Sequence, residues 1–310
     1  MQRQFNLRIG VDLMGSDTAP QVLFEALLKA QELISPKDKL VAFATKEIQQ
    51  QLLQKSNPKI EWCIAEDFIL MADDSLLALR HKKKSTIVLG IKSLKKKLID
   101  AFISSGNTGA LIASAALYLP KFSKNTRPAL LAFLPTQKGS VAVIDVGGNI
   151  SSKSEHLVQF AKMGAFFQSR RLNGAVPRVG LLNIGAESKK GTLEVRQAYE
   201  ALTQEKSSDM HFIGNVEARE IFEGKVDVLV TDGMAGNVLL KTAEGMASFI
   251  FDSLSKENLA LKPSLQQQFN YEEHPGAIIA GVEGLVIKCH GHASPHAMFT
   301  SIKGAIKLLA

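Results

Sequence analysis

Glycine-rich turns that carry lysine and amide side chains are the most chemically suggestive pattern in the sequence. The segment NIGAESKKGT, residues 183–192, places two lysines between Gly185 and Gly191. Backbone N–H groups in such a turn at the start of a helix, with a lysine nearby, can bind a phosphate group without a P-loop. The pattern therefore predicts an anion site around Lys190, whereas the neighbouring Lys189 is interpreted as part of a solvated loop.

A second turn of this kind, TDGMAGNVLLK at residues 231–241, precedes a long helical pattern and carries Asp232, Asn237 and Lys241. An asparagine in this place has two uses. Its side chain can cap the first turn of the helix, or its amide can bind a ligand. The sequence leaves these two interpretations of Asn237 equally open.

Several common sites are missing from the sequence. It has no G-x-G-x-x-G dinucleotide fingerprint, no G-x-x-x-x-G-K-[ST] nucleotide loop and no G-x-S-x-G nucleophile elbow. His290, His292 and His296 lie close together, but the segment CHGHASPHAMF adds no carboxylate, so we expect no metal site. Cys63 and Cys289 are too few for a disulfide framework, and we interpret both as buried small residues in a reducing compartment.

The elements that position these turns follow a repeated pattern of an apolar run, a glycine-containing turn and a helical stretch. The runs and turns occupy residues 7–17, 101–110, 141–149, 179–185 and 226–237. Strands that alternate with helices predict an α/β fold with a mostly parallel sheet. After the third run, Ser152-x-x-Glu155 has the spacing of a capping box and predicts the start of a helix. In such a sheet the five turns meet outside the carboxyl ends of the strands, where ligands bind.

Composition and charge narrow the classes of function. The 310 residues are 45% hydrophobic and 22% charged, which is typical of a folded globular chain. The N-terminal apolar stretch is too short for a signal peptide, and no window approaches the roughly 18 apolar residues of a membrane span, so we expect a cytoplasmic protein.

The basic charge is local. The net charge of +7 equals the seven lysines of residues 82–97, and this segment lacks the interleaved aromatic residues of a nucleic-acid site. Ile87, Ile91, Leu94 and Leu98 recur there at helical spacing, which predicts a helix with one buried face and lysines elsewhere. The lysines are interpreted either as a solvated face or as a landing site for an acidic partner.

The apolar pattern becomes longer beyond residue 237. A helical stripe consists of Leu239, Ala243, Met246, Ile250 and Leu254, and a second amphipathic stretch carries Leu259, Leu261, Leu265 and Phe269. The two stretches predict a helical hairpin over residues 237–271. Its apolar face is interpreted as core packing or, for the distal half, as a contact with a second copy or a membrane surface.

Taken together, the motifs resemble those of the bacterial phosphate acyltransferases (PlsX family). VDLMGSD, SSGNTGA, DVGGN, KSEHLVQFAKMG, PRVGLLNIGAESKKG, FIGNVEAREIFEG, DVLVTDGMAGNVLLKTAEG and VIKCHG follow in the order and spacing of that family, from about Leu7 to the C-terminal helix. The resemblance implies a three-layer α/β/α sandwich with a Rossmann-like sheet, similar to phosphotransacetylases and isocitrate/isopropylmalate dehydrogenases. We expect one catalytic domain over residues 1–310, from which the hairpin projects.

The resemblance also implies an activity and partners. The enzyme would convert acyl-[acyl carrier protein] and inorganic phosphate into acyl phosphate and free carrier protein. The product would supply a membrane glycerol-3-phosphate acyltransferase at the start of phosphatidic acid synthesis. The protein would be a homodimer, associated peripherally with the membrane, with no nucleic-acid partner and no cofactor.

The resemblance assigns the catalytic pair to Lys190 and Asn237. Substrate or phosphate contacts are expected from Asp12, Gly15, Ser105, Gly106, Asn107, Thr108, Asn149, Gly185, Asp232, Lys241 and His290. Carrier-protein contacts are expected from Lys92, Lys95 and Lys96. The sequence departs from the family pattern at Ser16, where a second glycine is usual, at GAIIAGVEG (residues 276–284) and at CHGHAS. The competing functions are a phosphotransacetylase that uses coenzyme A and a scaffold without activity that binds carrier protein or lipid.

Overall fold

The computed structural model describes residues 6–256 and 276–309, which form two compact units. Unit 1 consists of Met1–Phe122 and Glu272–Ala310, and unit 2 consists of Ser123–Tyr271. The expectation of a single catalytic domain stays a prediction.

Unit 1 contains a six-stranded sheet in the order β3-β2-β1-β4-β11-β10. All neighbouring strands are parallel except β10, which pairs with β11 in the antiparallel sense. The strands are β1 (Arg8–Asp12), β2 (Lys39–Thr45), β3 (Ile60–Ala65), β4 (Ala101–Ser104), β10 (Ala277–Ala280) and β11 (Leu285–Lys288). The helices are α1 (Pro20–Ala30), α2 (Lys46–Leu52), α3 (Ser75–His81), α4 (Thr86–Lys95), α5 (Thr108–Tyr118) and α10 (Pro295–Leu309), with a short 3-10 turn, η1 (Leu53–Lys55).

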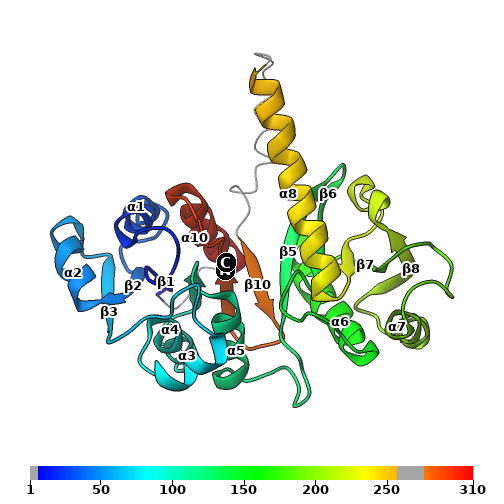
Figure 1. Ribbon diagram of the computed structural model, residues 1–310, viewed down its shortest axis with the longest axis horizontal. Coiled ribbons are helices and arrows are strands. Elements are labelled where there is room, and N and C mark those ends of the chain that lie inside the picture. Colours follow the sequence, from blue (N-terminus) through cyan, green and yellow to red (C-terminus); the bar gives the residue numbers. More distant parts are fainter. Residues whose placement is uncertain (1–5, 257–275, 310) are drawn as a thin grey trace. The chain divides into compact units, whose positions relative to one another are not determined.

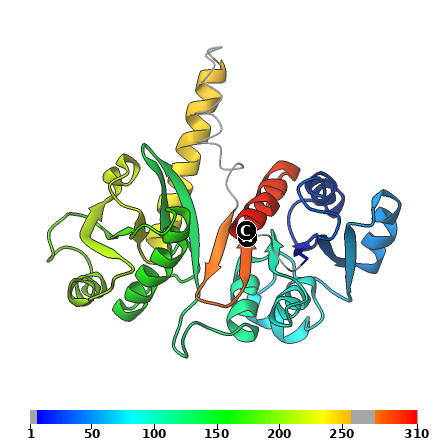
Figure 2. The same ribbon diagram turned by 180° about the vertical axis from the view of Figure 1, so that it is seen from behind.

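The helices of unit 1 cover both faces of its sheet. Helices α1 and α10 pack together on one face, and α3, α4 and α5 lie on the other (Figures 1 and 2). The strands are almost continuously apolar and buried, as expected for a parallel sheet covered on both sides. Phe43 and Phe102 meet edge to face within this core, with ring centroids 5.3 Å apart.

Unit 2 contains a five-stranded sheet in the order β5-β6-β9-β7-β8. Only β5 is antiparallel to its neighbour, and the other strands are parallel. Its strands are β5 (Ala129–Thr136), β6 (Gly139–Ile144), β7 (Arg178–Asn183), β8 (His211–Glu217) and β9 (Val228–Val230). Its helices are α6 (Ser154–Arg171), α7 (Leu193–Gln204) and α8 (Gly233–Lys256), with a 3-10 turn, η2 (Ala218–Glu223). The predicted class, a mostly parallel α/β sheet with flanking helices, is confirmed.

Two predicted helix starts differ from the structure. Helix α6 begins at Ser154 after Lys153, and the Ser152 hydroxyl has no hydrogen-bond partner among the described residues, so the predicted cap at Ser152 is wrong. Helix α8 begins at Gly233, which places Asn237 inside the helix rather than at its cap.

The long helix α8 is the described part of the predicted hairpin. Its C-terminal half extends beyond the strands of unit 2 and exposes Met246, Phe249 and Ile250 (Figure 1). The second helix of the prediction, with Leu261 and Leu265, lies outside the described residues. No helix among the described residues is long and apolar enough to cross a membrane.

Candidate active site

In unit 2, three parallel neighbours, β6, β9 and β7, end at one edge of the sheet. They are followed by the turn of residues 145–149, by residues 231–232 with the first turn of α8, and by the turn of residues 184–191. The structure therefore brings together the predicted glycine turns of this unit, and with them Asn149, Gly185, Lys190, Asp232 and Asn237.

The Lys190 turn is held in shape by two asparagine side chains. Asn183 Nδ2 donates to Lys190 O at 3.1 Å, and Asn215 Nδ2 donates to Glu187 O at 2.9 Å. Gly191 has φ +86°, and a Cβ there would lie 2.7 Å from Asn183 Oδ1, so the turn requires glycine. The Lys190 side chain is exposed at this edge, just ahead of the Thr192 cap of α7.

Glu187 is a carboxylate of this turn that the sequence analysis did not select. A Cβ on buried Gly185 would lie 2.7 Å from Glu187 Oε2 and 3.4 Å from Lys190 Cγ. Both side chains therefore approach the Gly185 backbone. The arrangement places a negative and a positive group on one short turn.

The buried carboxylate of Asp145 organises the turn after β6. Its Oδ1 accepts from the N–H groups of Leu130, Gly147 and Gly148 at 2.9, 3.1 and 2.8 Å. Its Oδ2 accepts from Asn149 Nδ2 at 2.8 Å. Burial raises the pKa of Asp145, and these hydrogen bonds oppose the rise because they favour the charged form.

Asn149 uses its amide within the chain. Its Nδ2 also donates to Pro128 O at 2.9 Å, and its Oδ1 accepts from Arg127 Nε. The side chain is buried, so its observed role is to hold the turn. A direct contact between Asn149 and substrate stays a prediction.

The first backbone N–H groups of α8 are already hydrogen-bonded within the protein. The N–H groups of Gly233 and Met234 donate to the carbonyls of Asn149 and Ile150, at 2.8 and 3.3 Å. Asp232 is the helix cap, because its Oδ1 accepts from Ala235 N at 2.8 Å. These backbone amides are therefore occupied and not open to an anion, whereas the Lys190 turn and the exposed side chains at this edge are.

Asn237 lies one turn into α8 with an exposed side chain. Its Nδ2 donates one hydrogen bond to Val146 O, at 3.2 Å. An amide nitrogen carries two hydrogens, and no acceptor for the second lies among the described residues, so this hydrogen can be donated to a ligand. Lys241, one turn later, pairs with Glu244 at 2.7 Å.

In unit 1, the adjacent parallel strands β1, β4 and β11 end in three polar residues in register: Asp12, Ser104 and Lys288. All three side chains are buried. Asp12 accepts from Ser104 Oγ at 2.8 Å, and Lys288 Nζ donates to the carbonyls of Ser105 and Cys289. Burial raises the pKa of Asp12 to about 6, although hydrogen bonds and the nearby ammonium of Lys288 lower it.

The other predicted residues of unit 1 surround this edge. Gly15 has φ +71°, and a Cβ there would lie 2.1 Å from Ile69 O. The Ser105 hydroxyl is buried without a partner among the described residues, and Gly106 N donates to Ser104 Oγ at 3.0 Å. Thr108 is the first residue of α5 and is half-buried.

The segment that carries His290 and His292 lies next to Asp17 of the VDLMGSD motif. His290 is half-buried, and His292 lies 3.5 Å from an Asp17 carboxylate oxygen. Across the described residues, no group of three metal-ligating side chains comes together. Cys289 is buried as predicted, whereas Cys63 is only half-buried.

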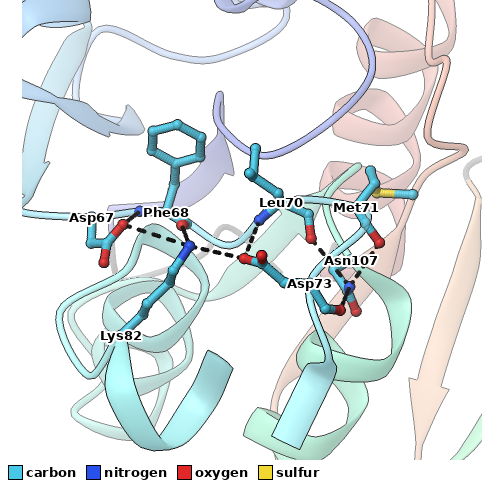
Figure 3. A network of polar contacts seen from close by, with 7 residues as sticks. All are labelled: Asp67, Phe68, Leu70, Met71, Asp73, Lys82 and Asn107. Carbon is cyan, nitrogen blue, oxygen red and sulfur yellow. Dashed lines mark hydrogen bonds and ion pairs between the residues drawn. The ribbon is translucent and has the colours of Figure 1, made fainter. Parts of the chain in front are cut away.

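Asn107 stabilises the loop that precedes α3 (Figure 3). Its Nδ2 donates to the carbonyls of Leu70, Met71 and Asp73 at 3.1–3.2 Å, and its Oδ1 accepts from Ala110 N at the start of α5. The same loop is held by the ion pair of Lys82 with Asp73, at 2.8 Å. Asn107 thus joins two loops, and a substrate contact stays a prediction.

The lysines of residues 82–97 do not form one patch. Lys82 and Lys84 pair with acids, and Lys92 lies 4.9 Å from the centre of the Tyr118 ring. Lys95 and Lys96 are exposed at the C-terminal end of α4.

The ends of α4 lie at opposite edges of the sheet of unit 1. Ile87 lies at the start of α4. Its Cδ1 would be 3.3 Å from a Cβ placed on Gly106, which is at the carboxyl edge. After its end, Leu98 O accepts from Arg8 Nε at the amino edge, and Leu98 is exposed rather than buried as predicted. Lys95 and Lys96 therefore lie at the edge away from Asp12.

Besides Glu187, the sequence did not lead us to predict Asp145 and Lys288 as residues of these edges. Each directly follows or ends an apolar run, VAVI before the aspartate and LVI before the lysine. A charged residue at the carboxyl end of a buried strand is the signal that could have selected them.

The sequence is similar to those of known proteins over nearly its whole length. Residues 7–310 match the family model described as fatty acid synthesis protein. A phosphate acyltransferase of Chlamydia pneumoniae is 41% identical, covering 97% of this chain and 95% of its own length. One from Chlamydia trachomatis serovar L2 is 42% identical over 97% of this chain and 94% of its own.

Solved structures share the fold at low identity. The EutD phosphotransacetylase of Staphylococcus aureus has a TM-score of 0.65 and 16% identity, covering 98% of this chain and 94% of its own. A branched-chain phosphotransacylase of Enterococcus faecalis has a TM-score of 0.64 and 13% identity, covering 98% and 100%. The full-length family match and the identities above 40% show that the chain belongs to the phosphate acyltransferase (PlsX) family.

Proposed function

We propose that this protein transfers an acyl group from acyl-[acyl carrier protein] to inorganic phosphate, producing acyl phosphate for phosphatidic acid synthesis. The observation that carries the proposal is the position of Lys190 and Asn237. They follow β7 and β9, which are paired neighbours, and both side chains are exposed at the carboxyl edge.

The transfer needs no nucleophile from the protein. A phosphate oxygen attacks the thioester carbonyl carbon, and the C–S bond then breaks to release the carrier-protein thiolate, which takes a proton from solvent. Lys190 would bind the phosphate, because an ammonium group attracts a dianion. It would also screen the negative charge of the phosphate as it approaches the carbonyl. The second amide hydrogen of Asn237 would stabilise the negative charge that develops on the carbonyl oxygen.

The partners follow from the same proposal. The exposed apolar residues of α8 support a contact with a second copy or with a membrane surface. A membrane glycerol-3-phosphate acyltransferase would use the acyl phosphate. Lys92, Lys95 and Lys96 are proposed as contacts for the acidic carrier protein.

The second candidate is a phosphotransacetylase that uses coenzyme A. It is favoured by the structural neighbours with that name, whose fold this chain shares. Both enzymes would use the Lys190 and Asn237 turns in the same way, so the thioester donor separates them. A scaffold without activity would need neither side chain.

The test is to incubate the purified protein with phosphate and either acyl-[acyl carrier protein] or acyl-coenzyme A, and to measure acyl phosphate. The proposal predicts product with the carrier-protein donor and little with coenzyme A. Lys190→Ala should lower turnover and phosphate affinity, and Asn237→Ala should lower turnover about 100-fold. Lys189→Ala, at the adjacent exposed residue, is the matched control and should be unchanged. An unchanged rate in Lys190→Ala and Asn237→Ala would contradict the assigned roles.

A further inference from the structure

Asp145 is the most completely hydrogen-bonded carboxylate at the carboxyl edge of unit 2 that the proposed chemistry does not use. It has no solvent exposure and accepts from three backbone N–H groups and one asparagine amide. Taking a charged carboxylate out of water costs free energy unless hydrogen bonds compensate. Each of its hydrogen-bond donors lies in the turn after β6 or beside it on β5. The hydrogen bonds that offset the cost of burying Asp145 therefore all hold this one turn.

That segment is in direct contact with Asn237. The Val146 carbonyl accepts from Asn237 Nδ2 at 3.2 Å, and a Cβ on Gly147 would lie 3.0 Å from the same nitrogen. Residues 146 and 147 therefore form the surface on which the amide rests. The Asp145 carboxylate holds these two residues in place by accepting hydrogen bonds from the N–H groups of Gly147 and Gly148.

The backbone of α8 rests on the same residue. A Cβ on Gly236 would lie 1.9 Å from Asp145 O, and Gly233 N donates to Asn149 O at 2.8 Å. The helix turn that carries Asn237 is thus seated on residues 145–149. Both the backbone and the side chain of Asn237 take their position from this turn.

We infer that Asp145 is a positioning residue for acyl transfer, which acts by holding the turn of residues 146–149 so that the free amide hydrogen of Asn237 points to the substrate. The inference rests on the proposed function. Asp145 is fully buried beneath the turn, so its effect on the reaction passes through Asn237. The Lys190 turn is held separately, by Asn183 at the Lys190 carbonyl and by Asn215 at the Glu187 carbonyl. Disturbing Asp145 should therefore affect Asn237 and leave phosphate binding at Lys190 intact.

The central experiment is a double-mutant cycle between Asp145 and Asn237. Asp145→Asn keeps the shape but places an amide nitrogen against Asn149 Nδ2, which loosens the turn. A displacement of about 1 Å at a catalytic group costs about 100-fold in rate, so kcat should fall by that order while KM for phosphate stays within about twofold. In the Asn237→Ala background, Asp145→Asn should cost little more, because its effect passes through Asn237. An equal loss in both backgrounds would overturn the inference.

A matched control separates positioning from loss of stability. Asp227, also in unit 2, pairs with Arg178 at 2.9 Å ahead of β9, at the opposite end of the strand from Asn237. Asp227→Asn should lower the melting temperature and leave kcat unchanged. If Asp145→Asn does not fold, Gly147→Ala takes its place in the cycle, since its Cβ would press on Asn237 Nδ2.

Hydrogen exchange tests the network without any assay of activity. In Asp145→Asn, the amides of Gly147 and Gly148 should exchange faster, and the side-chain amide signal of Asn237 should shift. Unchanged exchange and an unchanged signal would refute the inference even if acyl phosphate forms. Absence of acyl phosphate with the unmodified protein would instead refute the proposed function.

Discussion

Two glycines of the same helix give a sharp test of how α8 is seated. A Cβ on Gly236 would lie 1.9 Å from Asp145 O, whereas a Cβ on Gly245 meets no atom of the described residues within 4 Å. Replacing either with alanine gains the same helix propensity, about 1 kcal/mol. This gain cancels when the free energies of unfolding of the two variants are compared. Their difference is therefore the steric cost of the alanine at position 236.

The size of that cost follows from the overlap. The new methyl group would be about 1.5 Å closer to the carbonyl oxygen than an ordinary contact allows, and a backbone oxygen cannot rotate away. Overpacking of this kind costs about 1–3 kcal/mol, so Gly236→Ala should be less stable than Gly245→Ala by that amount. Because Asn237 is the next residue, a helix shift of this size should also lower kcat about 100-fold.

The measurements are urea unfolding, with the slope compared between variants, and the rate of acyl phosphate formation. Gly245→Ala should be more stable than the unmodified protein by about 1 kcal/mol and equally active. If Gly236→Ala matched Gly245→Ala in both stability and rate, the close seating of α8 on Asp145 would be refuted.

Three further predictions concern unit 1. Asn107→Ala removes a helix cap and three bonds to the loop ahead of α3, so the free energy of unfolding in urea should fall by about 2 kcal/mol. The pKa of Asp12 is about 6 in the fold and 3.8 as a free side chain, so the native state binds the proton more tightly. The free energy of unfolding, measured relative to that of Asp12→Asn, should therefore decrease by about 3 kcal/mol as the pH rises from 3.8 to 6, and should stay low above pH 6. If the difference between the two proteins did not change with pH, Asp12 would not be a buried carboxyl with a raised pKa. Charge reversal of Lys95 and Lys96 should raise KM for the carrier-protein substrate in a salt-dependent way, whereas Lys83→Glu, ahead of α4, should leave it unchanged; the reverse result would contradict the proposed carrier contacts.

The alternation of elements was predictable because it depends on local patterns. Apolar runs followed by glycine turns and helical stretches correspond to β1, β4, β6, β7 and β9, each followed by a turn at a carboxyl edge. A buried parallel strand needs an apolar sequence, and a sharp turn into a helix favours glycine, so both leave a mark in the sequence. That is why the glycine turns with Lys190 and Asn237 could be placed at the edge.

Helix starts were less predictable because several residues compete for the cap. Ser152 and Glu155 have capping-box spacing, yet the helix begins one residue later, and His156 Nδ1 accepts from Lys153 N at 3.3 Å. At α8, Asp232 caps the helix although Asn237 is an equally good capping residue by type. Tertiary contacts decide between such candidates. The carbonyls of Asn149 and Ile150 occupy the first amides of α8, and they come from the turn after β6, far away in sequence.

The asparagines that end glycine motifs show why residue type alone does not identify a ligand contact. Asn107 follows SG and Asn149 follows GG, and both were selected for the same reason as Asn237. In the fold, the amides of Asn107 and Asn149 are buried and bonded through both nitrogen and oxygen to the surrounding chain. Asn237 is exposed, and within the described part of the chain its amide donates a single bond, to Val146 O. An amide can stabilise a transition state only with a hydrogen that the protein has not already used, so the count of remaining donors, and not the motif, makes Asn237 the candidate for catalysis.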